Sequence, residues 1–325
     1  MAIYILRRLL QAIPILIGIS IISFIIVQAA PGDPTDRFRS GRVSPQVIAN
    51  LIRLYGLDKP PLEQFFSWFT AFWQFPFRAD AWGYSFVDGR PVTEKVAEKI
   101  PTTLQLMGTA LFVTAVVAVP LGVLAAVKQY SWADKIITTL ATIGYALPSF
   151  VLGGLLLYIF YIKIGPGSPL HFPGFGRYTL GGPQDLGDLA WHMVLPVSSL
   201  AIQQIAGWSR YMRSSMLEVL QQDYMRTARA KGLPGSKVLF KHGLRNALIP
   251  VITLLGLTIP SLLGGAAITE TIFSWPGLGF MAVQSVTTND YPVVLAIVMI
   301  GGVTVILGNL IADVLYGLVD PRIKY

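Results

Sequence analysis

The chain has 325 residues, of which 53% are hydrophobic and only 13% are charged, and its mean hydropathy is +0.59; this balance predicts an integral membrane protein. The 25 Lys and Arg residues outnumber the 17 Asp and Glu residues, for a net charge of +8, an excess that in a membrane protein bears first on topology and not on nucleic-acid binding. Because the chain has no cysteine, disulfides, thiolate nucleophiles and cysteine-based metal sites are excluded.

Uncharged runs long enough to cross a bilayer recur along the chain. A helix needs roughly 20 apolar residues to cross about 30 Å of hydrocarbon. Six runs meet this length: Leu9–Gly32, Ile100–Val127, Ile136–Ile162, Leu189–Ser209, Asn246–Thr269 and Tyr291–Ala312. They predict an all-α membrane protein with six transmembrane helices.

One further uncharged run, Thr271–Asn289, is interrupted by the sequence Trp275-Pro276-Gly277-Leu278-Gly279. A break exposed to lipid would leave backbone N–H and C=O groups without partners. We therefore do not expect this run to form a span.

The distribution of bases predicts the orientation. Six spans place both termini on one side, and more than half of the Lys and Arg residues fall in the segments on that side. The positive-inside rule then places both termini in the cytoplasm of a multi-pass inner-membrane protein. Arg7 and Arg8 precede an apolar run longer than that of a cleaved signal peptide, so we expect residues 1–32 to hold a short tail and an uncleaved first span.

The segment 33–99 has the pattern of an extracytoplasmic amphipathic region. Ser44-Pro45 indicates the start of one short helix, and Lys59-Pro60-Pro61 precedes a second with an aromatic stripe. Such helices commonly lie in the interfacial plane of the membrane. Residues 100–325 then form a core of five transmembrane helices with a cytoplasmic loop at 210–246.

Motifs of enzymatic chemistry are absent from the sequence. Gly232-Leu233-Pro234-Gly235-Ser236-Lys237 lacks the spacing of a phosphate-binding loop, and neither His-Glu-x-x-His nor Gly-x-Ser-x-Gly occurs. The three histidines have no ligand-pair spacing. We therefore expect no catalytic residue, no metal site and no cofactor in this chain.

Polar side chains are rare in the expected spans. Gln203 and Gln204 are the most polar pair, and they are suited equally to bonding between helices and to lining a translocation path. Glu270 and Asp313 lie at helix ends, where structural anchoring is favoured over a role in transport. A proton-coupled carrier would place an ionisable group nearer the midplane.

The stretch Asp223–Pro250 is strongly basic and has the pattern of a capped helix. Asp223 is suited to an N-cap, Tyr224 to Lys231 is compatible with two turns, and Gly232 is placed to end the helix. A second helical piece should run from about residue 236 to 245. The small residues among the bases favour close approach of a partner protein, but on spacing alone lipid-phosphate anchoring is equally supported.

This stretch resembles the EAA loop of ABC importer permeases in the peptide and nickel branch. Arg226-Thr227-Ala228 stands where the general motif begins Glu-Ala-Ala, Gly232 is its glycine, and Leu248-Ile249-Pro250 is its closing step. The replaced Glu and Ala and the longer gap resemble the dipeptide and oligopeptide branch. Other stretches similar to this branch include Pro31-Gly32-Asp33-Pro34, Tyr55-Gly56-Leu57-Asp58-Lys59-Pro60 and Glu270-Thr271-Ile272-Phe273-Ser274-Trp275-Pro276-Gly277-Leu278-Gly279.

The resemblance implies a type I importer permease, the first permease subunit of its system, that imports di- and oligopeptides and is not itself an enzyme. The implied partners are a second homologous permease, two ATPase subunits that bind ATP and Mg, an extracytoplasmic binding protein and the bilayer, with no nucleic acid. The implied ATPase-coupling residues are Asp223, Tyr224, Arg226, Thr227, Ala228, Arg229, Ala230, Lys231 and Gly232. Nickel, glutathione or an oligosaccharide is the alternative cargo, and an autonomous channel or ion-coupled carrier is the alternative class.

Overall fold

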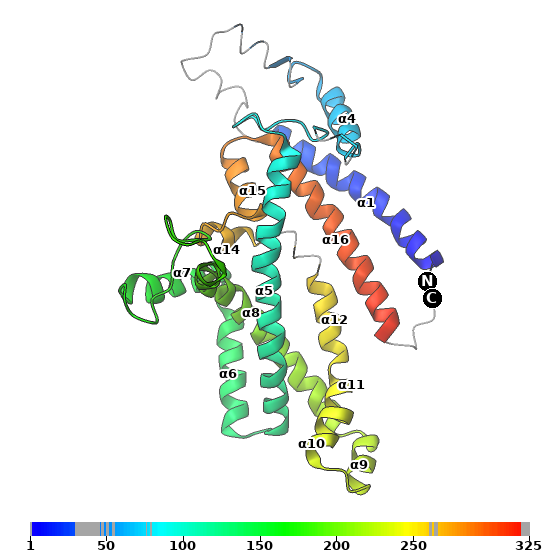
Figure 1. The fold of residues 1–325 in the computed structure, drawn as a ribbon. Helices are drawn as coiled ribbons and strands as arrows, with labels where there is room; N and C mark the ends of the chain where they lie inside the picture. Colours follow the sequence, from blue (N-terminus) through cyan, green and yellow to red (C-terminus); the bar gives the residue numbers. More distant parts are fainter. Residues whose placement is uncertain are drawn as a thin grey trace.

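The protein is described by a computed structural model that covers residues 2–29, 46, 49, 52, 53, 56–75, 77, 78, 80–259, 262 and 266–319, apart from the side chains of 2–4 and 313–319. Across these residues the chain is helical, and its β-structure is limited to an isolated bridge between Tyr84 and Pro91. Figure 1 shows an elongated bundle with α4 and α15 toward one end and α9 at the other. The predicted all-α membrane fold is confirmed.

Four long helices are apolar enough to cross a membrane as single segments. Their positions match four of the expected spans, and the helices extend beyond the apolar runs that predicted them. The first predicted span ends, at 30–32, outside the described residues. The four helices are α1 (Ala2–Ala29), α5 (Val92–Val127), α8 (Leu186–Leu220) and α16 (Tyr291–Val319).

The expected span at 136–162 is present as two helical parts that meet at a sharp bend. Helix α6 (Trp132–Ala146) is followed by α7 (Ser149–Leu157) and the π-helical turn η1 (Tyr158–Lys163), with a bend of 103° between the two parts. Pro148 has no N–H and disfavours helical backbone at Leu147, which is extended at ψ 126°. The proline thus separates two helices that the apolar pattern alone joins.

The expected span at 246–269 is also broken. The helical piece after α9 consists of α10 (Gly235–Lys237), the π-helical η2 (Val238–Leu244) and α11 (Arg245–Ala247), which confirms the second helix of the basic loop. A bend of 42° leads into α12 (Ile249–Thr258), with Pro250 in its first turn. Counting each bent pair as one span brings the total among the described residues to six.

Helices α5 and α8 pack closely through a glycine. A Cβ added at Gly122 of α5 would lie 2.5 Å from the Cβ of Met212 and 2.7 Å from the backbone oxygen of Ser209, both on α8. Contacts this short are beyond what van der Waals packing tolerates. Gly122 therefore sets the distance between the two helices.

The run Thr271–Asn289 forms no span, as expected. It contains the end of α14 (Ala267–Ile272) and the short helix α15 (Leu278–Thr287), with a tight turn between them. Trp275 in this turn is fully buried, and its indole Nε1 donates a hydrogen bond of 3.0 Å to the backbone oxygen of Thr102 on α5. The turn is thus anchored to a transmembrane helix.

Glu270 holds the same turn from inside. Its side chain is fully buried and accepts hydrogen bonds from the hydroxyl of Thr103 at 3.0 Å and from the N–H of Phe280 at 2.8 Å. Thr103 also accepts a bond of 2.7 Å from the N–H of Leu278. The expected anchoring role of Glu270 is confirmed, while Asp313 has a side chain outside the described residues.

The second expected outer helix is present as α4 (Pro61–Phe72), with Pro61 in its first turn. Its aromatic side packs on α1, where the ring of Phe24 lies 5.4 Å from Phe65 and 6.2 Å from Trp68. Phe72, at its end, stacks on Trp82 at 5.1 Å. The first expected outer helix falls largely outside the described residues.

Replacing Gly122 with alanine should destabilise the bundle. The added methyl group forces α5 and α8 apart, and overpacking of this kind costs about 1–3 kcal/mol in the free energy of unfolding. Thermal unfolding in detergent measures the change. Gly108→Ala on the same helix is the matched control, because nothing lies within 4 Å of its added Cβ. Equal unfolding temperatures for the two variants would contradict the assigned contact.

Thr103→Val tests the anchored turn. The substitution keeps the shape of the side chain but removes the hydroxyl that donates to Oε1 of Glu270 and accepts from the N–H of Leu278. Glu270 keeps its bond from Phe280, whereas the N–H of Leu278 loses this acceptor, and a buried unsatisfied group costs about 1–3 kcal/mol. We expect a lower unfolding temperature in detergent. Thr142→Val is the control, since among the described residues the hydroxyl of Thr142 bonds only to the backbone oxygen of Thr138 in its own helix. A loss no larger than that of the control would refute the anchoring.

Candidate functional site

Helix α9 (Asp223–Ala230) lies at the end of the bundle opposite α4 and α15 (Figure 1). The N-cap is Gln222, whose side chain makes no capping hydrogen bond, and Asp223 is the first helical residue. The predicted N-cap at Asp223 is therefore wrong by one position. Its carboxylate still lies in the first turn, where the helix dipole favours negative charge.

Gly232 ends the helix as expected. Lys231 is the C-cap, and Gly232 follows in the left-handed region at φ +72°. Its N–H donates a hydrogen bond of 3.0 Å to the backbone oxygen of Arg229. This backbone conformation strains residues that have a Cβ, so glycine is the residue suited to the position.

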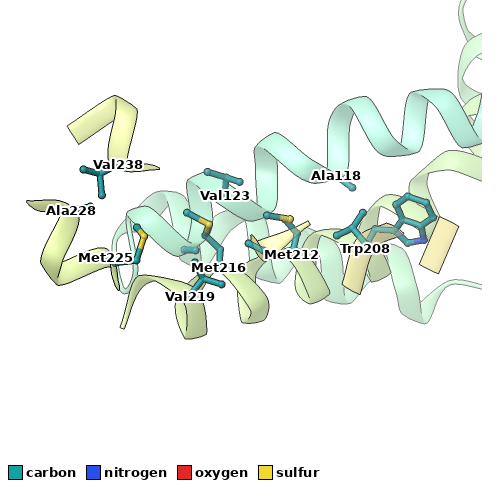
Figure 2. Packing of buried hydrophobic residues seen from close by; sticks show 12 residues of the cluster. Ala118, Val123, Trp208, Met212, Met216, Val219, Met225, Ala228 and Val238 are labelled. Atoms are coloured by element: carbon teal, nitrogen blue, oxygen red, sulfur yellow. The ribbon is translucent and has the colours of Figure 1, made fainter. Parts of the chain in front are cut away.

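The inner side of α9 is apolar and fully packed. Met225 is fully buried and Ala228 is 6% exposed. Figure 2 shows Met225 beside Met216 and Val219 of α8, and Ala228 beside Val238 of η2, all in one buried cluster. Ala228 thus faces the interior of this chain. It is therefore not one of the small residues that a partner protein could approach closely.

A second glycine makes this packing possible. A Cβ added at Gly243 in η2 would lie 2.9 Å from the Cε of Met216 and 3.3 Å from the Cε of Met225. The two methionine methyl groups therefore occupy the space beside a residue that has no side chain. Because methionine is flexible and unbranched, it fills such a gap well.

The outer side of α9 is cationic and exposed. Arg226, Arg229 and Lys231 are exposed, and among the described residues the only carboxylate within salt-bridge distance of them is Asp223, whose Oδ1 lies 3.6 Å from Arg226. That pair is itself highly exposed and contributes little to stability. Between Asp223 and Gly232 the other exposed residues are Tyr224, Thr227, Ala230 and Gly232. The exposed bases Lys237, Lys241 and Arg245 follow on the next helical piece.

The apolar core beneath α9 continues into the transmembrane helices. Figure 2 shows Met216, Met212 and Trp208 following one another along α8, with Ala118 and Val123 of α5 alongside. All five side chains are buried. Met225 and Ala228 of α9 thus belong to the same close-packed core as side chains of α5 and α8.

An ion pair joins α6 to α8. The guanidinium of Arg213 donates hydrogen bonds of 2.7 and 2.8 Å to the two carboxylate oxygens of Asp134 near the start of α6. Asp134 also accepts a bond of 2.9 Å from the N–H of Tyr130. One helical turn away on α8, the guanidinium of Arg210 lies 4.5 Å from the ring centre of Tyr145 on α6.

The two glutamines of α8 differ in their contacts. The side-chain amide of Gln203 donates a hydrogen bond to the backbone oxygen of Leu147 at the bend between α6 and α7. It therefore satisfies an acceptor at the break in the helix. Within the described part of the chain, the buried Oε1 of Gln204 has no hydrogen-bond partner.

The described residues contain no group of three or more His, Asp and Glu side chains that could hold a metal ion. His192 contacts the hydroxyl of Thr179 at 3.2 Å and the backbone oxygen of Gly176 at 3.1 Å. His171 contacts the backbone oxygen of Ile164 at 2.6 Å. Both histidines thus contact residues of the segment between η1 and α8.

Some residues of the site could not be singled out from the sequence. Asp134 and Arg213 are separated by 79 positions, and their pairing depends on how α6 packs on α8. Met225 and Ala228 did carry a signal, since they are apolar residues three positions apart and therefore lie on one face of a helix. That spacing indicates a face packed on the protein.

Two family models match the chain. The model described as binding-protein-dependent transport system inner membrane component covers residues 118–325, and the model of the N-terminal membrane component of such systems covers residues 1–107. The chain is 45% identical over 326 residues to the oligopeptide transport system permease protein AppB of Bacillus subtilis, covering 100% of both chains. It is 39% identical to the glutathione transport system permease protein GsiC of Salmonella typhi, covering 99% of both.

A solved structure supports the fold. An inward-facing structure of the MetNI methionine ABC transporter matches with a TM-score of 0.53 and 17% sequence identity, covering 71% of this chain and 98% of the other. The fold, the apolar helices long enough to span a membrane and the two family models all indicate the membrane component of a transport system. The chain belongs to the family of binding-protein-dependent transport system inner membrane components, and it is a multi-pass inner-membrane permease subunit of an ABC importer and not itself an enzyme.

Proposed function

We propose that the chain is the first of two permease subunits in an ABC importer of di- and oligopeptides. Its partners are a second homologous permease, two ATPase subunits that bind ATP and Mg, and an extracytoplasmic binding protein. The similarity to AppB, named as an oligopeptide permease, extends over the full length of both chains and supports this cargo. No cofactor binds to this chain itself.

Glutathione is the second candidate cargo. The relative GsiC is named as a glutathione permease and is 39% identical to this chain, less than the 45% of AppB. Glutathione is itself a peptide, so the two cargoes share an amide backbone and terminal charges. Nickel and oligosaccharides, the other cargoes of similar machines, have no comparable support in the named relatives.

Helix α9 is the element through which the permease couples to ATP hydrolysis. The observation that carries this proposal is its two-sidedness, with exposed bases on one side and Met225 fully buried on the other. Such a helix presents a charged docking surface without being free to move independently of the spans. Ala228 positions the helix. The residues that face the partner are Asp223, Tyr224, Arg226, Thr227, Arg229, Ala230, Lys231 and Gly232.

The exposed charges predict the chemistry of the docking groove. Arg226 occupies the place of the glutamate in the general EAA motif, so the sign of the charge presented to the partner is reversed there. A complementary ATPase groove carries carboxylates opposite Arg226 and Arg229, because electrostatic complementarity selects partners and orientation. Lipid phosphate alone does not account for the packed inner face of the helix.

Movement of α9 is passed to the spans in two ways. The buried cluster that contains Met225, Met216 and Met212 passes the movement to α5 and α8. The ion pair of Arg213 and Asp134 passes it to the start of α6. Closing of the ATPase pair would then shift these helices together. Gln203, bonded at the bend of α6 and α7, holds the bent span on α8, while Gln204 offers an acceptor to the translocation path.

We infer that α9 lies in the cytoplasm together with both termini. Helices α1 and α16 each have one end near α4 and extend from there in the direction of α9, so that the start of α1 and the end of α16 lie about midway along the molecule (Figure 1). Arg7, Arg8 and the bases of the α9 stretch then lie on the cytoplasmic side, as the positive-inside rule requires. The opposite end, with α4 and α15, faces the binding protein.

Reconstitution tests the cargo and the class together. The purified complex of both permeases and both ATPases, in vesicles with the binding protein, should take up a labelled tripeptide only when ATP is supplied. Unlabelled oligopeptide should compete with this uptake, and unlabelled glutathione should compete less strongly. Uptake that favours glutathione would reassign the cargo, and uptake by this chain alone would support a channel or carrier.

Gly232→Asn tests the coupling helix. Asparagine tolerates the left-handed backbone, and nothing in this chain lies within 4 Å of the added Cβ. The permease should therefore fold normally, while its affinity for the ATPase subunits falls about tenfold, equivalent to about 1.4 kcal/mol. Copurification of the ATPases and peptide-stimulated ATP hydrolysis are the measurements, and retention should also weaken as salt is raised.

The matched control is Gly181→Asn. Gly181 has a similar backbone conformation, at φ +74°, and open space around its Cβ, but it lies in the loop before α8. ATPase retention by this variant should equal that of the unmodified complex. Normal retention and stimulation in Gly232→Asn would count against α9 as the docking surface.

A further inference from the structure

An open cavity of about 510 Å³ lies where α1, α4 and the first turn of α16 meet. Its size is within the range of small-molecule sites, which is about 300–1,000 Å³. It is formed by Phe24 and Val27 of α1, Trp68 of α4, the loop around Trp82 and Leu295 of α16. It is separate from α9 and from the core between α5 and α8.

The cavity lies at the boundary of the apolar membrane layer. Helix α1 ends at Ala29 and α16 begins at Tyr291, and both are apolar spans whose lining residues here lie within two turns of those ends. Trp and Tyr side chains, which concentrate at membrane interfaces, surround it as Trp68, Trp82 and Tyr84. The cavity therefore opens at the depth of lipid headgroups and the upper acyl chains.

One wall of the cavity is apolar. The rings of Phe24 and Trp68 lie nearly parallel at 6.2 Å, and Leu295 adds an aliphatic surface. Trp82 also lines the cavity, and its indole N–H is not free to bind a ligand, since Nε1 donates a bond of 3.1 Å to the backbone oxygen of Phe72. This wall is suited to a hydrocarbon chain, which packs against apolar side chains through dispersion contacts.

The rim of the cavity is cationic. Arg53 and Lys59 both line it and are exposed, and neither has a carboxylate partner among the described residues. The one acid in the lining, Asp80, is engaged by the guanidinium of Arg78 at 3.0 and 3.2 Å. The rim therefore has two positive charges available for an anion.

The amide groups nearby add neutral polarity between rim and wall. Gln28 of α1 donates a hydrogen bond of 3.2 Å to Gln64 of α4, and Gln64 donates one of 2.8 Å to the backbone oxygen of Lys59. Moving from the rim inward, the cavity is thus cationic, then amide-lined, then apolar. A phospholipid has the same order of phosphate, glycerol ester and acyl chain, whereas a peptide would also need a free carboxylate for its ammonium group.

We propose that this cavity binds one anionic phospholipid from the leaflet opposite α9, with its phosphate at Arg53 and Lys59 and an acyl chain along Phe24, Trp68 and Leu295. The bound lipid joins α1 and α4 to α16. Free phosphate shares the headgroup chemistry but lacks the chain, so it binds far more weakly. The proposal does not depend on which solute the importer carries.

Native mass spectrometry of the purified importer complex in detergent tests this site. Supplied with dioleoyl phosphatidylglycerol, the complex should retain one lipid molecule, and Arg53→Gln with Lys59→Gln should lower that retention at least tenfold. Both side chains are exposed, so the double variant should unfold at an unchanged temperature. Lys163→Gln, an exposed base at the end of η1, is the matched control and should behave as the unmodified complex.

The lipid arms separate the sources of the anion. Dioleoyl phosphatidylcholine should be retained less than phosphatidylglycerol, and millimolar inorganic phosphate should not displace the bound lipid. Brominated acyl chains on phosphatidylglycerol should quench tryptophan fluorescence more in the unmodified complex than in the double variant. Equal lipid retention by the double variant, equal retention of the two lipids, or displacement by phosphate would overturn the proposal.

Discussion

The close contact between α5 and α8 is the constraint on which the rest of the structure depends. Gly122 lets the two helices approach until the side chain and backbone of α8 occupy the space where a Cβ would lie. In the first third of α5 (Val92–Val127), Thr102 and Thr103 anchor the turn that contains Trp275. Near the other end of α5, helix α9 packs against the same helix pair. Both ends of the permease are thus tied to a single helix pair.

Hydrogen-bonding requirements in the membrane explain the less regular features. Prolines break two of the spans, and each break frees backbone groups that hydrocarbon cannot satisfy. At the bend after α6 the amide of Gln203 supplies a partner for Leu147. At the turn after α14, buried Glu270 accepts from Thr103 and Phe280. Polar side chains in the bundle therefore serve chiefly to complete the backbone where helices stop.

The sequence pattern was sufficient for the helical class, the spans and the end of α9. Apolar runs of sufficient length predict spans because a helix must satisfy its own backbone in lipid. Gly232 marks the end of α9 because few other residues adopt its backbone conformation. The pattern missed the bends at Pro148 and before Pro250, since hydropathy is the same on both sides of each bend and carries no direction.

The sequence by itself determined that the chain is a helical membrane protein with a basic loop resembling that of importer permeases, because composition, run length and local motifs are properties of neighbouring residues. Only the tertiary structure decided that Ala228 faces inward, that Gly243 makes room for Met216 and Met225, and that Arg213 meets Asp134. These contacts join residues far apart in the chain, and their distances depend on how the helices pack. The same packing decides which side of α9 is left free for a partner.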